Sequence, residues 1–244
     1  MEMDRRAVLG AAAALGASRT EAAVPDKTSP LDLAARVARI EDADAVRALH
    51  FKYGYYMDAS AFEDIVELFA DDCEIHFLGG VYRGKAGARR LYVQRLGADR
   101  NRAGRLHDHL MMQDIVDVAP DGRTAKARFR CFMQAGVHVS RNDLANAGVQ
   151  TWQSGIYENQ YEKIGGVWRV KLFNYMLIWE ATFADGWSQL DTAARDAAVY
   201  SKTFPTDPTG PDELEPVRPK FWPQHVVAPF HYPNPVRESK LAAP

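Results

Sequence analysis

Residues 149–180 read VQTWQSGIYENQYEKIGGVWRVKLFNYMLIWE, and this stretch decides the fold. On both sides of Gly165-Gly166, aromatic and β-branched residues alternate with polar ones, which is the pattern of a half-buried strand. A two-residue Gly-Gly connection between such runs is a strong hairpin signal. The sequence therefore predicts that residues 149–163 and 167–180 form two long antiparallel strands.

A second pair of strands is predicted just before this hairpin. Residues 107–118 are strand-like and end at the turn Ala119-Pro120-Asp121-Gly122. Residues 123–139 then alternate as the return strand, with Ala125, Ala127, Phe129, Cys131 and Met133 set against Lys126, Arg128 and Arg130. The second half of the domain thus contains four long antiparallel strands.

Helical patterns come first in the chain. In residues 31–57, apolar side chains recur at spacings of three and four. A second helix is predicted over about 61–70, where Ser60 and Glu63 resemble a capping box, and a third from Gly84 to about Leu96.

A short strand, Cys73 to Phe77, lies between the second and third helices. Three N-terminal helices followed by a strongly curved antiparallel sheet make an α+β fold. Such a sheet and a long first helix enclose a cone with one open mouth.

The N-terminus has the organisation of an export signal. Arg5-Arg6 precedes a short apolar run, residues 10–17, and a small-residue cleavage zone follows. Residues 1–27 are therefore predicted to be a signal peptide of the twin-arginine type. This predicts an exported, periplasmic protein, or a cytoplasmic one if the signal is not used.

Residues 183–244 are predicted to form a C-terminal helix and an arm rich in proline and aromatic residues. From Phe204 onward the chain carries ten of its thirteen prolines, which exclude regular structure. Aromatic side chains in such a segment favour an extended arm over the domain or a neighbouring subunit. We expect a homodimer or homotrimer with this arm at the interface.

Composition and motifs exclude several function classes. The net charge of −2 gives no field that attracts nucleic acid or a membrane surface. Cys73 and Cys131 lie in apolar runs and are predicted to be buried free thiols. Residues 80–85 lack the spacing of a phosphate-binding loop, and His107 and His109 lack a third ligand. No metal and no cofactor are expected.

The loop arginines Arg100, Arg102 and Arg105 stand among Gly, Asp and Asn. Charged runs without interleaved aromatic residues are usually solvated surface. We expect them to be solvent-exposed and without function.

A candidate acid/base pair remains where the pattern demands apolar residues. Asp58 ends the first helix, Tyr53 lies five residues earlier on its core-facing stripe, and His109 begins the first long strand. Met111 and Gln113 are expected to share the face of His109. A carboxylate beside an imidazole fixes its tautomer and raises its basicity, which suits a general base near neutral pH.

Several motifs give the chain a diffuse resemblance, over about residues 35–180, to a known family. They are FKYGYYMD (51–58), IVELFADD (65–72), GVYRGK (80–85), His109 with Gln113, DGRTA (121–125), YENQY (157–161) and GVWR (166–169). Together they resemble the SnoaL-like branch of the nuclear-transport-factor-2 (NTF2) superfamily. The resemblance implies an NTF2-like cone in residues 31–182.

The resemblance also implies site residues. Scytalone dehydratase, lindane dehydrochlorinase and bile-acid 7α-dehydratase share an Asp and a His that fall on Asp58 and His109, and the bile-acid enzyme uses a Tyr that falls on Tyr53. The second active-site histidine of scytalone dehydratase has no match, since Phe129 or Cys131 stands there. The pair carries over, but the substrate contacts do not.

On this basis we expect a cofactor-independent lyase that eliminates water or formaldehyde from a small aromatic or polycyclic alcohol. A sphingomonad diarylpropane lyase of the same superfamily suggests a lignin-derived diol that yields a stilbene. The expected substrate-binding residues are Tyr56, Phe77 and Trp152, with Arg83 and Lys85 as cations for a phenol or carboxylate.

Two other readings stay open at this point. One is a non-catalytic small-molecule-binding or scaffold protein, because a fold does not determine a function. The weaker one is an isomerase that uses the same aspartate as a base on a ketone. A contact between Asp58 and His109 would discriminate, since a carrier has no need for it.

Overall fold

The computed structural model describes residues 30–189, 199–217 and 220–236. The predicted signal peptide, residues 1–27, lies outside them, as do residues 190–198, 218–219 and 237–244 of the region predicted to form a C-terminal helix and arm. The chain divides into two units, 1–37 and 38–244, and the described part of the first unit is the beginning of helix α1. No helix among the described residues is long and apolar enough to cross a membrane.

The three predicted helices are present. They are α1 (Pro30–Asp58), α2 (Phe62–Glu67) and α3 (Gly84–Arg89), which continues into a π-helical stretch, η1 (Arg90–Leu96). Helix α2 is shorter than predicted because the chain enters a strand at Phe69.

The predicted capping box at α2 is wrong. The helix begins one residue later than Ser60 requires, with Ala61 at the cap position and no side-chain cap hydrogen bond. Ser60 has a φ of 57°, in the left-handed region, and belongs to the turn that ends α1. Glu63 forms an ion pair with Arg89 of α3 instead.

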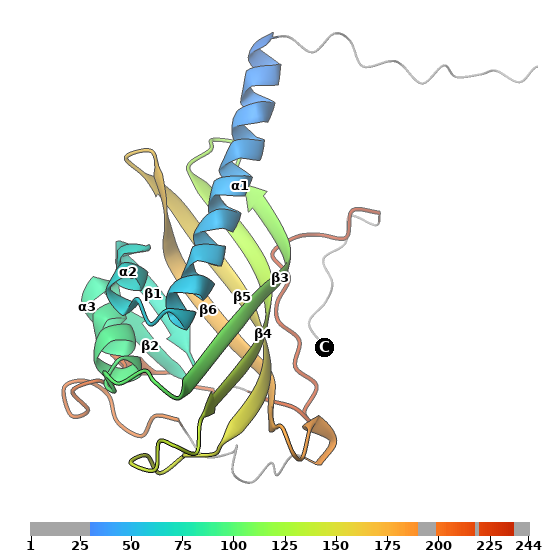
Figure 1. Ribbon diagram of the computed structural model, residues 1–244. Coiled ribbons are helices and arrows are strands. Elements are labelled where there is room, and N and C mark those ends of the chain that lie inside the picture. The colour runs from blue at the N-terminus through green and yellow to red at the C-terminus, as the bar shows by residue number, and fades with distance from the viewer. Residues whose placement is uncertain (1–29, 190–198, 218–219, 237–244) are drawn as a thin grey trace, which may run out of the picture. The chain divides into compact units, whose positions relative to one another are not determined.

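The strands of the described residues form one open sheet of seven strands, most of which are labelled in Figure 1. The strands are β1 (Phe69–Phe77), β2 (Gly80–Arg83), β3 (Arg105–Val118), β4 (Thr124–Val137), β5 (Gln150–Ile164), β6 (Val167–Thr182) and β7 (Glu213–Leu214). Their order is β3-β4-β5-β6-β1-β2-β7, and every neighbouring pair is antiparallel except β1 and β6. The four long strands are those predicted, whereas β2 and β7 were not.

The β5–β6 hairpin forms as the sequence indicates. Gly165 and Gly166 have φ values of 57° and 83°, the left-handed pair that a type I′ turn requires. Lys163 pairs with Trp168, and after a register shift between Gln160 and Tyr161 the strands pair Tyr157 with Tyr175 on the inner face.

The core lies between the inner face of the sheet and the helices. It is unusually aromatic, with Tyr53, Phe62, Phe69, Tyr82, Tyr92, Phe129, Tyr157, Tyr161, Trp168 and Phe173 all buried. Asp42 of α1 accepts a hydrogen bond from Trp168 Nε1 at 2.9 Å and forms an ion pair with Lys163. These two contacts hold the helix against the β5–β6 hairpin. Cys73 and Cys131 are buried free thiols, as predicted.

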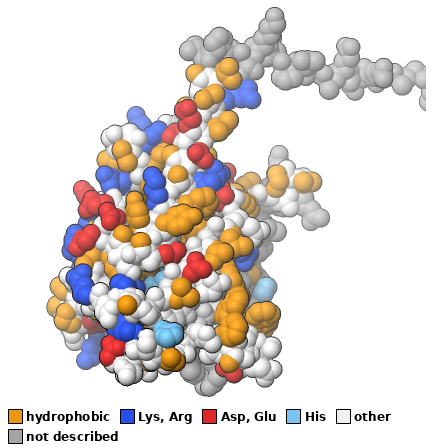
Figure 2. All heavy atoms as spheres, viewed as in Figure 1, with side chains coloured by type: hydrophobic (Ala, Val, Ile, Leu, Met, Phe, Trp, Pro, Cys, Tyr) orange, Lys and Arg blue, Asp and Glu red, His pale blue; other side chains and the backbone are white. Residues whose placement is uncertain are grey.

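The outer face of β3 is partly apolar. Leu106, Leu110, Met112 and Ile115 are exposed there. Figure 2 shows such apolar side chains among charged ones on the surface over this strand.

Residues 228–231 of the C-terminal arm pack on the outer face of the sheet. Arg128 of β4 donates to the carbonyls of Ala228 (3.0 Å) and Pro229 (2.7 Å) and lies 4.1 Å from the centre of the Phe230 ring. His231 contacts Glu158 of β5 at 2.8 Å. The described arm is therefore held by specific polar contacts within the chain.

Candidate active site

The end of α1 and the strand β3 bring the predicted acid/base pair together. Asp58 Oδ1 accepts hydrogen bonds from the backbone N–H of His109 (3.0 Å) and from His109 Nδ1 (2.7 Å). Close packing permits this approach: at Gly54, one turn earlier, an added Cβ would lie 3.1 Å from Met111 Cγ. A glycine at this position lets the helix lie directly on the strand.

The two nitrogens of the His109 ring have different environments. Because Nδ1 donates its proton to Asp58, the neutral imidazole carries its lone pair on Nε2. The His109 side chain is only 7% exposed and that of Asp58 24%. A carboxylate at a helix C-terminus faces the negative end of the helix dipole, so the two donors of His109 are what stabilise it here.

Strand β3 aims His109 inward through simple alternation, which a β-bulge then interrupts. Arg105, His107, His109 and Met111 face inward before the bulge, and Asp114, Val116 and Val118 do so after it. The pairing with β4 shifts between Met112 and Ile115, and Gln113 has a φ of 39°. The expectation that Gln113 shares the face of His109 is therefore wrong; its side chain is exposed and accepts a hydrogen bond from Arg130.

Tyr53 lies one and a half turns before Asp58 on the buried face of α1. Its ring packs against Tyr92 and Tyr157, with centroids 6.0 and 6.1 Å apart, and it is 3% exposed. Burial raises the pKa of Tyr53 far above its usual value, so the phenol stays protonated and can act only as a hydrogen-bond or proton donor.

Aromatic and apolar groups form the inner wall next to these residues. Phe77 of β1 stacks on Tyr175 of β6 with ring centroids 5.8 Å apart, and Tyr175 packs on Tyr157. Gly155 lies beneath Tyr175, where an added Cβ would be 2.3 Å from the ring. Tyr56 is partly buried against the same core. Phe77 and Tyr56 therefore lie against the core, and their role in substrate binding stays a prediction.

The two predicted substrate-binding cations are engaged elsewhere. Arg83 of β2 is ion-paired with Glu74 and Glu213, at the opposite edge of the sheet from β3. Lys85 of α3 is ion-paired with Glu67 at 2.8 Å. The sequence shows cations but not the carboxylates that meet them, and the structure does not bring either cation to the Asp58–His109 pair.

Trp152 was also misplaced by sequence reasoning. It lies opposite Gln134 of β4, on the outer face, and contacts Phe132 and Phe183 with ring centroids 5.3 and 5.7 Å away. Trp179 belongs to the same outer cluster. When aromatic residues occur at both odd and even positions of a strand, the sequence does not show which set faces the core. In β5 the odd-numbered positions, which include Gly155 and the tyrosines, face inward.

Two residues near the pair, His107 and Arg102, were not among the predicted site residues. His107 lies two residues before His109 on the same inner face, with ring centroids 6.1 Å apart. Arg102 Nη2 lies 3.4 Å from His107 Nδ1. The spacing of two residues between His107 and His109 indicates that they share a face of the strand. Arg102 lies in a loop, where the sequence has no periodic pattern that could predict its position.

Among the described residues, no group of three or more His, Cys, Asp or Glu side chains is placed to hold a metal ion. The chemistry that these residues can themselves perform is proton transfer by an oriented imidazole, beside a protonated phenol and an aromatic wall.

Solved structures with the same architecture include enzymes. A scytalone dehydratase-like protein of Novosphingobium aromaticivorans DSM 12444 superposes with a TM-score of 0.51 at 17% identity, covering 61% of this chain and 91% of that one. LinA gives 0.52 at 16% identity over 62% and 95%. The hexachlorocyclohexane dehydrochlorinase LinA-type3 of Novosphingobium barchaimii LL02 gives 0.51 at 16% over 61% and 94%. At these identities the likeness establishes the fold.

No curated protein matches the chain. The predicted NTF2-like α+β cone, with few helices packed on a large, open, mostly antiparallel sheet, is confirmed. Residues 38–174, more than half of the sequence, match the SnoaL-like domain, and the chain therefore belongs to the SnoaL-like family.

Proposed function

We propose that this protein is a cofactor-independent lyase in which His109, oriented by Asp58, is the general base. The observation that carries the proposal is the double hydrogen bond from His109 to Asp58 Oδ1. It fixes both the tautomer and the direction of the imidazole, and it provides a negative charge next to the imidazolium that forms when His109 takes a proton.

In a dehydration, Nε2 removes a proton from the carbon next to the one that carries the leaving hydroxyl. The C–H electrons form the double bond, the C–O bond breaks, and the proton returns from His109 to the departing oxygen as water. Tyr53, protonated at all physiological pH, supplies a hydrogen bond to developing oxygen charge. Atoms and charge balance without an oxidant or reductant.

The same base supports loss of formaldehyde from a 1,3-diol. Nε2 then removes the proton of the primary hydroxyl, the adjacent C–C bond breaks, and formaldehyde is released. The electron pair of that bond forms the alkene and expels the benzylic hydroxyl, which leaves as water with the proton from His109. A 1,2-diarylpropane-1,3-diol would give a stilbene.

The wall favours a flat aromatic substrate. Tyr157, Tyr175 and Phe77 present stacked or tilted rings on the inner face, and offset aromatic contacts add about 0.5–1.5 kcal/mol each beyond burial. The dehydratase-like and dehydrochlorinase structures that share the fold are consistent with elimination chemistry. These features support a small aromatic alcohol or diol as substrate.

The test is turnover by the purified protein alone. A panel of aryl alcohols and diarylpropane diols is incubated with the wild type, and stilbene-like absorbance and released formaldehyde are measured. His109→Gln should lower turnover roughly 10²–10⁴-fold, whereas His225→Gln, which changes an exposed histidine, should not. Binding of these compounds without turnover, or full activity in folded His109→Gln, would instead indicate a ligand carrier.

A further inference from the structure

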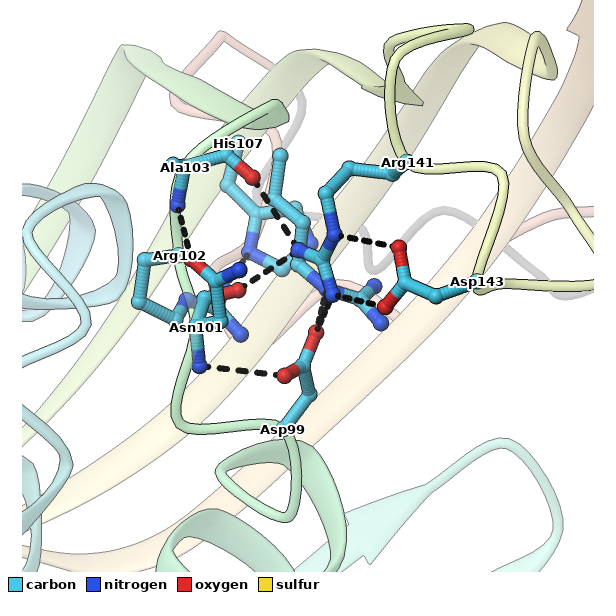
Figure 3. A network of polar contacts seen from close by, with 8 residues as sticks. Asp99, Asn101, Arg102, Ala103, His107, Arg141 and Asp143 are labelled. Carbon is cyan, nitrogen blue, oxygen red and sulfur yellow. Dashed lines mark hydrogen bonds and ion pairs between the residues drawn. The ribbon is translucent and has the colours of Figure 1, made fainter.

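Arg102 stands apart from the other arginines around the loop that leads into β3. Asp99 accepts from Arg105 Nε at 2.6 Å and from Arg141 Nη2 at 3.0 Å, and Arg141 is also held by Asp143 at 2.9 Å (Figure 3). These carboxylates are therefore already shared. Within the described ranges, no ion pair joins Arg102 to a carboxylate.

The guanidinium of Arg102 is nevertheless drawn away from water. Its Nε is buried and has no hydrogen-bond partner, and its Cζ lies 5.5 Å from the centre of the Phe62 ring. Burial, and then the nearby charge of Arg105, lower the pKa of Arg102. A partly desolvated cation with an unused donor is costly unless a ligand satisfies it.

His107 extends this donor set toward the catalytic base. Arg102 has only donors, so the 3.4 Å contact makes His107 Nδ1 the acceptor and leaves a proton on Nε2. Burial, together with the charges of His109 and Arg102, lowers the pKa of His107 to about 4. The ring is therefore neutral near pH 7 and presents an N–H donor next to His109.

We propose that Arg102 and His107 bind an acidic oxygen of the substrate, a phenolate or a carboxylate, and hold it beside His109. This inference rests on the proposed function and names the substrate class of the same site. Both side chains offer donors and neither offers a free acceptor, so an anionic oxygen complements them. For a phenol, the guanidinium stabilises the ionised form, whose electron release helps to expel a benzylic leaving group.

Binding of simple probes tests this without any turnover. The probes are 4-nitrophenol, whose ionised form is visible by absorbance, and benzoate, which is measured by calorimetry. The corresponding methyl ether, 4-nitroanisole, and methyl benzoate serve as uncharged controls. The wild type should bind both anions and shift 4-nitrophenol toward its ionised form, whereas the uncharged compounds should bind more weakly.

The variants decide the assignment. Arg102→Gln should weaken binding of both anions roughly tenfold to a hundredfold, Arg102→Lys should weaken it less, and Arg100→Gln, in the same loop but exposed, should leave it unchanged. His109→Gln should still bind the anions. Equal anion binding by the wild type and folded Arg102→Gln, or no anion binding by the wild type, would overturn the proposal.

The outcomes separate the two proposals. If the anions bind through Arg102 but His109→Gln loses no turnover, the recognition site stands and the lyase mechanism fails. If turnover depends on His109 but Arg102→Gln binds the anions as tightly as the wild type, the mechanism stands and this inference fails. Binding of one probe class only would select phenolate or carboxylate as the natural group.

Discussion

Asp58 accepts two hydrogen bonds from a single residue, His109, one from its backbone and one from its ring. The backbone bond fixes the helix end to the strand, so the contact does not depend on imidazole orientation alone. Asp58→Asn can retain the backbone contact but offers no charge to the imidazolium. We expect turnover to fall roughly 10²–10⁴-fold with little change in melting temperature. Loss of folding in place of turnover would show that the contact is structural.

Two histidines with lowered pKa values, His50 and His107, should make the protein sensitive to acid. Burial lowers the pKa of His50, which stacks on Phe129, to about 3, and that of His107 to about 4. As pH falls below about 6.5, both histidines become protonated in the unfolded chain but stay neutral in the folded chain. Stability is therefore lost progressively between about pH 6.5 and these folded values, by on the order of a few kcal/mol per group.

Melting temperature against pH checks this, with His50→Phe as the informative variant. It removes one titrating group while keeping a ring against Phe129, so the curve should be flatter below pH 6.5 even if stability at pH 7 is lower. His225→Gln is the control at an exposed position. A slope equal to that of the wild type would contradict the assignment to His50.

His76 should have the opposite pH dependence. Its Nδ1 lies 2.8 Å from Glu215 and its Nε2 2.6 Å from Glu74, and the hydrogen bond to Glu215 is the largest cause of a raised pKa. A raised folded pKa contributes stability that is complete below about pH 6.5 and is lost as pH rises through the folded value. Glu215 directly follows β7, so its contact with His76 holds this part of the chain on the sheet. As this contact weakens with rising pH, a protease should cut the wild-type chain beyond residue 205 faster. His76→Gln should remove that dependence; a dependence that persists in this variant would assign it to another group.

The thiols should be inert in the native state. Burial raises the pKa of both Cys73 and Cys131 to about 12, so almost no thiolate is present at neutral pH. A disulfide reagent should react slowly with the folded protein and rapidly with two thiols after denaturation. Fast reaction of one thiol in the native state would mean that the inner wall opens to solvent.

Gly155 is expected to be intolerant of any side chain. An added methyl group would meet the Tyr175 ring at 2.3 Å, so Gly155→Ala should displace the ring, cost about 1–3 kcal/mol and reduce aromatic binding. Gly165→Asn is the matched control, because no neighbouring atom lies near its Cβ and asparagine tolerates its positive φ. Chemical denaturation compares the two, and equal stabilities would refute the steric argument.

Periodicity made most of the fold predictable. The alternation about Gly165-Gly166 and the spacing of apolar residues in 31–57 are local signals, and the structure follows both. The short strands β2 and β7 were missed because their pairing depends on a partner far away in sequence: Val81 pairs with Glu213, 132 positions later. Contacts of this kind leave no local pattern.

The candidate site also contains residues that local patterns predicted and residues whose placement depends on distant contacts. The contact between Asp58 and His109 was predicted from periodicity and from the family resemblance: Asp58 ends a periodic helix, and His109 faces inward in a periodic strand, of which it is the fifth residue. The catalytic role of the pair stays a prediction. Arg83 was expected to meet substrate and is ion-paired with Glu74 and Glu213, whereas Arg102 was expected to be solvent-exposed and has a buried Nε. Sequence alone does not tell which arginine meets a carboxylate. The prediction that Trp152 lines the site was wrong because the packing of the whole sheet, and not the local sequence, determines which face of β5 lies inward.

The bulge at Gln113 divides β3 into two halves in which positions of opposite parity face inward. Ahead of it, odd-numbered positions carry the histidines; beyond it, even-numbered positions such as Val116 join the core and Asp114 forms an ion pair with Arg47 of α1 at 2.7 Å. A substitution in the first half can thus alter chemistry while the second half keeps the helix anchored. For the lyase proposed above, the residues around His109 can therefore diverge while the ion pair between Asp114 and Arg47 is kept.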